Sequence, residues 1–166
     1  MSEKAKQSKC KANLSQFGKG YTIYLLDIGK QVQYPEKSGQ GFILSLYNSK
    51  ILIEPEVYIC PSAEEHHLSL EEIKEEFTSY PDKGDANGPV SYAGRKNANQ
   101  NVYPGIFNLL EDVTTTPIAS DDIGESHNHE NGTVINFLFL DGHVDHDREN
   151  LNFHGDLKKQ LDVLAN

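Results

Sequence analysis

The stretch EKAKQSKCKANLSQFGKGYTIYLLDI, residues 3–28, decides the fold. It contains no proline, and its apolar residues recur at spacings of four, three, four and three: Cys10, Leu14, Phe17, Tyr21 and Tyr24. This spacing places them on one face of an α-helix. The sequence therefore predicts an amphipathic helix from Ser2 to about Ile28 whose apolar stripe packs on the rest of the protein.

The two ends of this helix differ in character. The first nine residues carry almost no apolar stripe, so we expect them to be solvated unless a segment outside this chain continues or covers them. Gly18 and Gly20 each cost about 1 kcal/mol relative to alanine in a helix. We expect both glycines to permit close packing of the helix on a sheet.

Length and charge limit the class of protein. A chain of 166 residues with 37% hydrophobic residues suits one domain, residues 1–166. The net charge of −10 argues against nucleic-acid binding, because phosphate-binding proteins display lysine and arginine. Residues 1–20 nevertheless hold five lysines against one glutamate. No stretch approaches the roughly 18 apolar residues of a membrane span, and no signal-peptide core is visible.

The middle of the chain alternates helical and extended patterns. The stretch GFILSLYNSKILIEPEVYICPS, residues 41–62, predicts a short helix from Gln40 to Asn48 and then an extended segment ending at Cys60. Ser69 stands three residues before Glu72, the spacing of a capping box, and predicts a helix over residues 70–79. The stretch VSYAG, residues 90–94, predicts a strand.

The last third reads as strands. The runs TPIASDD, residues 116–122, GTVINFLFL, residues 132–140, and HVDHD, residues 143–147, are rich in strand formers. Asp141 and Gly142 stand between the last two runs, which predicts a two-residue type I′ hairpin turn. The spacing of Leu157, Leu161 and Leu164 predicts a short C-terminal helix.

Histidines and acids gather around this hairpin and raise the question of a metal site. Zinc favours histidine with carboxylates, and calcium favours carboxylate oxygens near strand ends. A regular hairpin sends His143 and His146 to opposite faces and cannot bring both to one ion. The candidate ligands are Asp121, Asp122, His127, His129, Asp141 and His143. The alternative is that these side chains are solvated.

Several fragments in order resemble the bacterial pilin-like proteins (pseudopilins) whose C-terminal region is described by a histidine, nine residues and Asp-Gly. Residues 3–28 resemble the second half of that family's long helix, with a basic stretch, a cysteine, Asn-Leu and an aromatic stripe. The stretch YICPS, residues 58–62, resembles its Cys-Pro-Ser segment, and residues 91–94 its Ser-Tyr strand. Here eleven residues rather than nine separate His129 from Asp141.

The resemblance implies an α+β fold, in which a long N-terminal helix packs on a small antiparallel sheet. Residues 1–29 would be the C-terminal half of that helix and residues 30–166 the globular head. A leader cut by a prepilin peptidase and an apolar half-helix anchored in the inner membrane would precede this chain, with the head in the periplasm or outside the cell. From spacing alone Cys10 and Cys60 could be buried thiols or a disulfide, and the resemblance implies the disulfide.

The resulting hypothesis is a structural, non-enzymatic subunit of a type II secretion pseudopilus or a type IV pilus-like filament. Its partners would be other subunits and the assembly machinery. It would require no cofactor, although calcium would suit Asp121, Asp122 and Asp141. Two alternatives stay open: a metal-dependent hydrolase centred on His127, His129, Asp121 and His143, and a secreted ligand-binding module with Tyr92 and Tyr103 lining a groove. No nucleophile, oxyanion hole or phosphate loop accompanies the histidines.

Overall fold

A computed structural model describes the chain at the following residues: 1–30, 33–63, 69, 71–72, 74–75, 77, 90–96, 114–121, 129, 134–148 and 164–165. Its elements, in chain order, are α1 (Glu3–Asp27), α2 (Gln40–Asn48), the 3-10 helix η1 (Pro55–Tyr58), β1 (Ala93–Arg95), β2 (Pro117–Ser120), β3 (Val134–Phe139), β4 (Val144–Arg148) and β5 (Leu164–Ala165).

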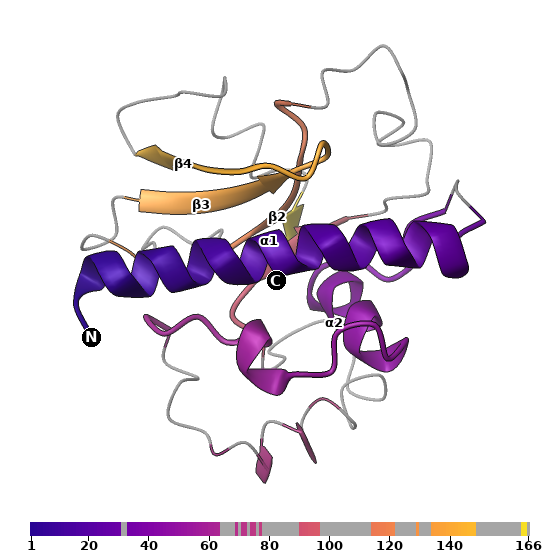
Figure 1. Ribbon diagram of the computed structural model, residues 1–166, viewed down its shortest axis with the longest axis horizontal. Helices are drawn as coiled ribbons and strands as arrows, with labels where there is room; N and C mark the ends of the chain where they lie inside the picture. The colour runs from indigo at the N-terminus through magenta and orange to yellow at the C-terminus, as the bar shows by residue number, and fades with distance from the viewer. Residues whose placement is uncertain are drawn as a thin grey trace.

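The strands form one antiparallel sheet in the order β4-β3-β2-β1-β5. The long helix α1 lies across this sheet, and α2 packs beside it (Figure 1). This is the predicted α+β arrangement of a long N-terminal helix on a small antiparallel sheet, and it is compatible with a pilin-like fold. None of the helices in the described part of the chain combines the length and apolar character needed to cross a bilayer.

The apolar stripe of α1 forms the centre of the core, as its spacing predicts. Cys10, Leu14, Phe17 and Tyr21 are buried, and Tyr24 packs partly buried against them. The Phe17 ring contacts two tyrosine rings, with centroid distances of 5.4 Å to Tyr58 and 5.1 Å to Tyr92. Burial of one such aromatic side chain contributes about 1.5–3 kcal/mol. These aromatic contacts fix the face that the helix turns toward the sheet.

At the two glycines of α1, an added Cβ would be in tight contact with a leucine side chain. A Cβ atom on Gly18 would lie 3.0 Å from Cδ1 of Leu138 on β3, and one on Gly20 would lie 3.0 Å from Cδ1 of Leu46 on α2. Gly18 therefore permits close packing on the sheet, as predicted. Gly20 serves the contact with α2 instead.

The segment between α1 and the sheet is more helical than predicted. Helix α2 has the predicted bounds, but residues 55–58 form η1 instead of the extended chain that we expected before Cys60. Pro55 explains the difference, because its fixed φ suits the first position of a helical turn. Tyr58, at the end of η1, is fully buried and donates a hydrogen bond to the Leu52 carbonyl at 2.7 Å.

The predicted capping box is present. The Ser69 backbone N–H donates to Oε2 of Glu72 at 2.8 Å, and the Glu72 backbone N–H donates to Oγ of Ser69 at 3.3 Å.

The strand predicted at residues 90–94 begins later, at Ala93. The Gly94 position on that strand has no room for a side chain, because its Cβ would lie 2.3 Å from the Gly39 carbonyl oxygen.

The turn between β3 and β4 differs from the two-residue type I′ turn predicted at Asp141 and Gly142. Leu138 pairs with Val144, and the Phe139 N–H donates to the His143 carbonyl at 3.0 Å. Of the two turn residues only Gly142 has a positive φ, of 89°. This is a three-residue loop with a glycine bulge, which shifts the strand pairing by one residue from the predicted register.

The prediction of a C-terminal helix is wrong at the two residues that the structure describes there. Leu164 and Ala165 form β5, and they pair antiparallel with Arg95 and Gly94 of β1. Leu164 is buried beside Ile135, Phe137 and Phe139, on the sheet face opposite Leu138. Leucines spaced for a helix can also end in a strand when an unpaired sheet edge offers hydrogen bonds, since tertiary pairing overrides local pattern. Leu157 and Leu161 lie outside the described residues.

Candidate functional site

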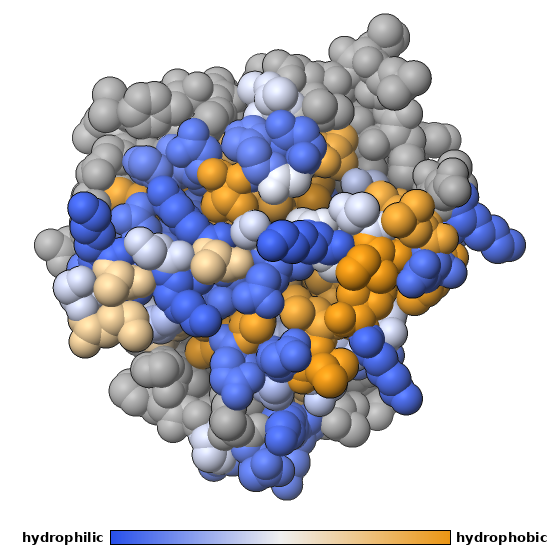
Figure 2. Space-filling view, viewed as in Figure 1, coloured by the Kyte–Doolittle hydropathy of each residue, from blue (hydrophilic) through white to orange (hydrophobic). Residues whose placement is uncertain are grey.

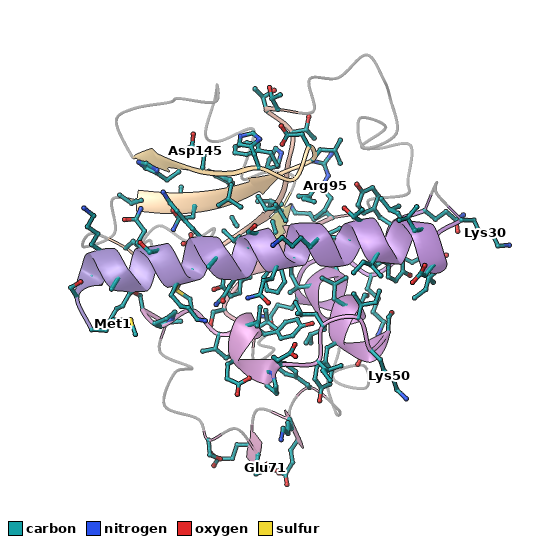
Figure 3. All side chains as sticks on the ribbon, in the orientation of Figure 1. Met1, Lys30, Lys50, Glu71, Arg95 and Asp145 are labelled. Carbon is teal, nitrogen blue, oxygen red and sulfur yellow. A yellow bond between two sulfur atoms is a disulfide. The ribbon has the colours of Figure 1, made fainter. Side chains whose placement is uncertain are left out.

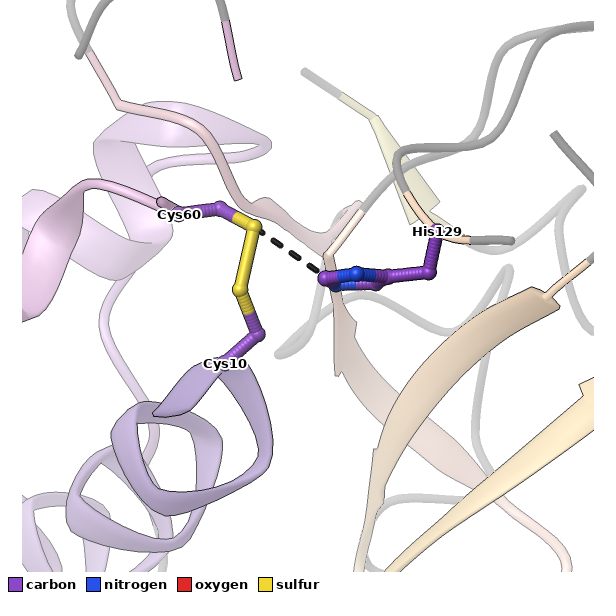
Figure 4. A group of neighbouring side chains, drawn as sticks. All are labelled: Cys10, Cys60 and His129. Carbon is purple, nitrogen blue, oxygen red and sulfur yellow. Dashed lines mark hydrogen bonds between the residues drawn. A yellow bond between two sulfur atoms is a disulfide. The ribbon is translucent and has the colours of Figure 1, made fainter. Parts of the chain in front are cut away.

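His129 is the centre of a buried polar cluster where three parts of the chain meet. Its backbone forms an isolated bridge with Val134 at the start of β3. Its ring points toward the disulfide between α1 and the segment after η1 (Figure 4). The His129 side chain is fully buried, which requires its ring nitrogens to find partners within the protein.

Both ring nitrogens of His129 face carboxylates. Nε2 lies 3.0 Å from Oδ2 of Asp121, and Nδ1 lies 2.8 Å from Oε1 of Glu3. Asp121 is fully buried, whereas the Glu3 side chain is 42% exposed. An ionised carboxylate only accepts hydrogen bonds, so both contacts are satisfied together only when both nitrogens carry a proton. The geometry therefore favours the imidazolium form of His129.

Asp121 is held rigidly by the neighbouring strand. Its Oδ1 accepts the backbone N–H of Asn136 at 2.9 Å, and its Oδ2 accepts the Asn136 side-chain amide. The Asp121 backbone N–H in turn donates to the Asn136 carbonyl at 3.1 Å. Three contacts to one residue of β3 fix the carboxylate at the end of β2, in the orientation that meets His129.

A disulfide joins Cys10 to Cys60, the pair that the resemblance implied, with their Cα atoms 5.5 Å apart. Both cysteines are fully buried, and Sγ of Cys60 lies 3.6 Å from Nε2 of His129. Ser62 lies two residues further on, and its hydroxyl donates to Oε1 of Glu3 at 3.3 Å. The disulfide and the His129 cluster thus tie the same segments together: the start of α1, residues 60–62 and the sheet.

The environment of His129 shifts two pKa values in opposite directions. Burial lowers the pKa of His129, but the hydrogen bonds and charges of Asp121 and Glu3 outweigh it and raise this pKa above 6.5. Partial burial raises the pKa of Glu3, but the hydrogen bond and charge of His129, with smaller contributions from Ser62 and Lys6, lower it below 4.5. Both shifts favour the charged pair.

Stability should depend on pH through His129. Because the folded pKa is raised, the contribution of His129 is fully present below the unfolded value of about 6.5 and is lost as pH rises through the folded pKa. We expect the difference in unfolding free energy between the disulfide form of the protein and its His129→Gln variant to be larger at pH 6 than at pH 9. Urea unfolding measures this difference, and an NMR titration of His129 measures the pKa. A difference that grows toward pH 9 would contradict the charged pair.

The structure brings only part of the predicted metal set together. Asp121 and His129 are in contact, whereas Asp141 and His143 pair with each other in the β3-β4 turn, where the His143 ring stacks on Phe139 at 4.6 Å. Across the described residues, the one group of three or more side chains with metal-ligand geometry is Cys10, Cys60 and His129. Asp122 and His127 lie outside those residues. Among the described residues, His143 is not a member of that group.

His146 has other neighbours than His143, which lies against Asp141 and Phe139. Its Nδ1 lies 3.0 Å from Nζ of Lys11 on α1 and 3.3 Å from Asp145.

Tyr92 cannot line an exposed ligand groove, because it is fully buried and accepts a hydrogen bond from the Asn13 side chain at 2.9 Å. Tyr103 lies outside the described residues.

Comparison with protein-family models, with curated proteins and with solved structures finds no match for this chain. The function is therefore inferred from the residues and their geometry.

Proposed function

We propose that this chain is the head of a pilin-like filament subunit that works by self-assembly rather than by catalysis. The observation that carries the proposal is the division of α1 into two faces. Its inner face is fastened to the sheet, while its outer face carries apolar side chains in one half and lysines in the other.

The inner face makes α1 a rigid part of the head. The buried stripe packs against β3, α2 and η1, and the Cys10–Cys60 disulfide adds a covalent link near the start of the helix. A helix that transmits contacts between subunits has to hold its position relative to the head. This attachment supplies that rigidity.

The outer face has an apolar patch near the C-terminal end of α1. Ile23 is 44% exposed, Leu26 60% and Ile28 47%. Figure 2 shows apolar surface gathered toward the end of α1 that Figure 1 places at the right. Grouped apolar side chains that stay exposed mark interaction surfaces more often than scattered ones do.

The opposite end of α1 is basic. In the first turns Lys4 and Lys9 are exposed and Lys6 is partly exposed, and the labels Met1 and Lys30 lie near the two ends of the helix in Figure 3. Residues 1–20 carry four surplus positive charges, while the whole chain has a net charge of −10. A basic end on an acidic molecule favours head-to-tail contacts between copies over face-to-face ones.

The proposal predicts a membrane anchor upstream of this chain. In the structure, the first turn of α1 holds a hydrogen bond from the Ala5 N–H to the Ser2 side chain, at 3.3 Å. The native sequence upstream of Met1 is the direct test. A leader followed by about 20 apolar residues, the length of a membrane span, would support the filament proposal, and its absence would overturn the anchored form of it.

The assembly test uses the native full-length protein, expressed with a prepilin peptidase and assembly machinery. Leu26→Glu places a charge in the apolar patch, and we expect it to abolish filaments in electron micrographs. Ile53→Glu is the matched control, because Ile53 is 58% exposed but lies away from α1 in sequence, after α2. Filament loss in neither variant, or equal loss in both, would contradict assembly through α1.

A further inference from the structure

The strongest unassigned feature is the group of Cys10, Cys60 and His129. All three side chains are fully buried, and one ligand atom from each lies within 4.8 Å of the others. They come from α1, from the segment after η1 and from the bridge before β3, so they meet only in the folded chain (Figure 4). In the disulfide form both sulfurs are occupied by the bond between them.

We infer that the reduced form of this chain binds one zinc ion through the Cys10 and Cys60 thiolates and Nε2 of His129. The zinc form and the disulfide form exclude each other, because both use the same two sulfur atoms. The inference does not depend on the proposed assembly function.

The distances suit tetrahedral zinc. Zn–S bonds of about 2.3 Å and Zn–N bonds of about 2.0 Å place sulfur and nitrogen roughly 3.5 Å apart in a tetrahedral site. Sγ of Cys60 lies 3.6 Å from Nε2 of His129 before any ion is bound. The two sulfurs would separate to about 3.8 Å in a zinc dithiolate. With Cα atoms 5.5 Å apart, side-chain rotation accomplishes this with little backbone movement.

The carboxylates of Glu3 and Asp121 determine which ring nitrogen of His129 is free to bind zinc. Glu3 accepts from Nδ1 at 2.8 Å, which fixes the ring and leaves Nε2 to carry the lone pair for the metal. Asp121, 3.0 Å from Nε2, gives up that hydrogen bond when the ring nitrogen binds the metal, and it lies outside the group of three side chains with ligand geometry. Two thiolates and one imidazole are three of the four ligands of a tetrahedral zinc site, and water takes the fourth position.

The chemistry balances with a small-molecule thiol as the reductant. Two thiol molecules reduce the Cys10–Cys60 disulfide to two cysteine thiols and leave as their own disulfide. Zinc then displaces one proton from each cysteine thiol and one from Nε2 of the His129 imidazolium, and that nitrogen donates the lone pair so freed to the metal. Exchange with a small-molecule disulfide reverses the first step: the two thiolates re-form the Cys10–Cys60 disulfide, two small-molecule thiols leave after taking up two protons, and the ion is released. Zinc would thus join the same segments of the chain that the disulfide joins.

The test is a cobalt titration of the full chain reduced with a phosphine, which neither binds the metal strongly nor forms mixed disulfides. We expect one equivalent of cobalt to give thiolate charge-transfer absorption and the intense visible bands of a tetrahedral site, and zinc to abolish both. The disulfide form should show neither. If reduction unfolds the chain, zinc should restore its helical circular dichroism.

Variants distinguish metal binding at this site from nonspecific metal binding by cysteine thiols. Cys60→Ser should remove the tetrahedral cobalt spectrum, and His129→Gln should weaken the affinity at least tenfold. Asp121→Asn should weaken it less than His129→Gln does, by at most about tenfold, because the Asp121 carboxylate lies beside the site without belonging to the ligand group. His143→Ala is the control, because that partly exposed histidine contacts Asp141 and Phe139 at the β3-β4 turn and does not belong to the group of three ligands, and it should leave the titration unchanged. A missing cobalt spectrum in the reduced protein, or an affinity that does not change in His129→Gln, would overturn the inference.

Discussion

Replacing both Cys10 and Cys60 with alanine is expected to lower the free energy of unfolding by about 4 kcal/mol. The disulfide spans a sequence separation of 50 residues, and the chain-entropy model gives about this value for such a loop. Domains of this size have total stabilities of roughly 5–15 kcal/mol, so the loss is a large fraction of the whole. Both cysteines are fully buried in the core, and alanine leaves no unpaired polar group there. Urea unfolding under oxidising conditions measures the difference.

The control for this prediction is reduction of the wild-type protein in the presence of a metal chelator. Reduced wild type and the double alanine variant both lack the covalent link, so their stabilities should agree within about 1 kcal/mol. The double variant should be insensitive to the reductant. A double variant that loses less than about 1 kcal/mol would show that the link contributes little beyond the packing around it.

The 4-and-3 spacing of the apolar stripe predicted α1, and the apolar run from Gln40 to Asn48 predicted α2, whose residues 40–44 and 46 are buried. Tyr24, at the end of the α1 stripe, is only partly buried and packs against the edge of the core. Local sequence patterns gave wrong predictions where the backbone conformation depends on a single residue or on pairing with a distant strand. The β3-β4 turn took a three-residue form because Gly142 alone adopts a positive φ, and the leucine spacing near residue 164 gave way to pairing with β1.

The His129 cluster could be predicted only in part for a related reason. Asp121 and His129 stood in one polar stretch of sequence, so composition pointed to both. Glu3 lies 126 residues from His129, and no periodicity connects an exposed first helical turn to a loop before β3. The cysteines entered only as a disulfide pair, and their approach to His129 follows from how α1 crosses the sheet. Contacts of this kind are tertiary, and a pattern in one segment carries no information about them.

Asp121→Ala is expected to destabilise the protein by about 3–5 kcal/mol near pH 6, the range for removing one partner of a buried ion pair. The variant leaves the His129 imidazolium with Glu3 alone and deprives the Asn136 amide groups of their acceptor. Asp121→Asn keeps the shape and one acceptor oxygen but loses the charge, and it should cost about 1.5–3 kcal/mol. Thermal and urea unfolding at this pH measure both losses.

Asp141→Ala is the matched control for Asp121→Ala, because it also removes a carboxylate that pairs with a histidine. The Asp141–His143 pair is partly exposed, with side chains 29% and 38% accessible, so water replaces the lost contact and the cost should be at most about 1 kcal/mol. Asp121→Asn should also move the pKa of His129 downward, whereas Asp141→Ala should not. Equal destabilisation by Asp121→Ala and Asp141→Ala would mean that burial does not strengthen the pair, and that His129 is neutral in the folded protein.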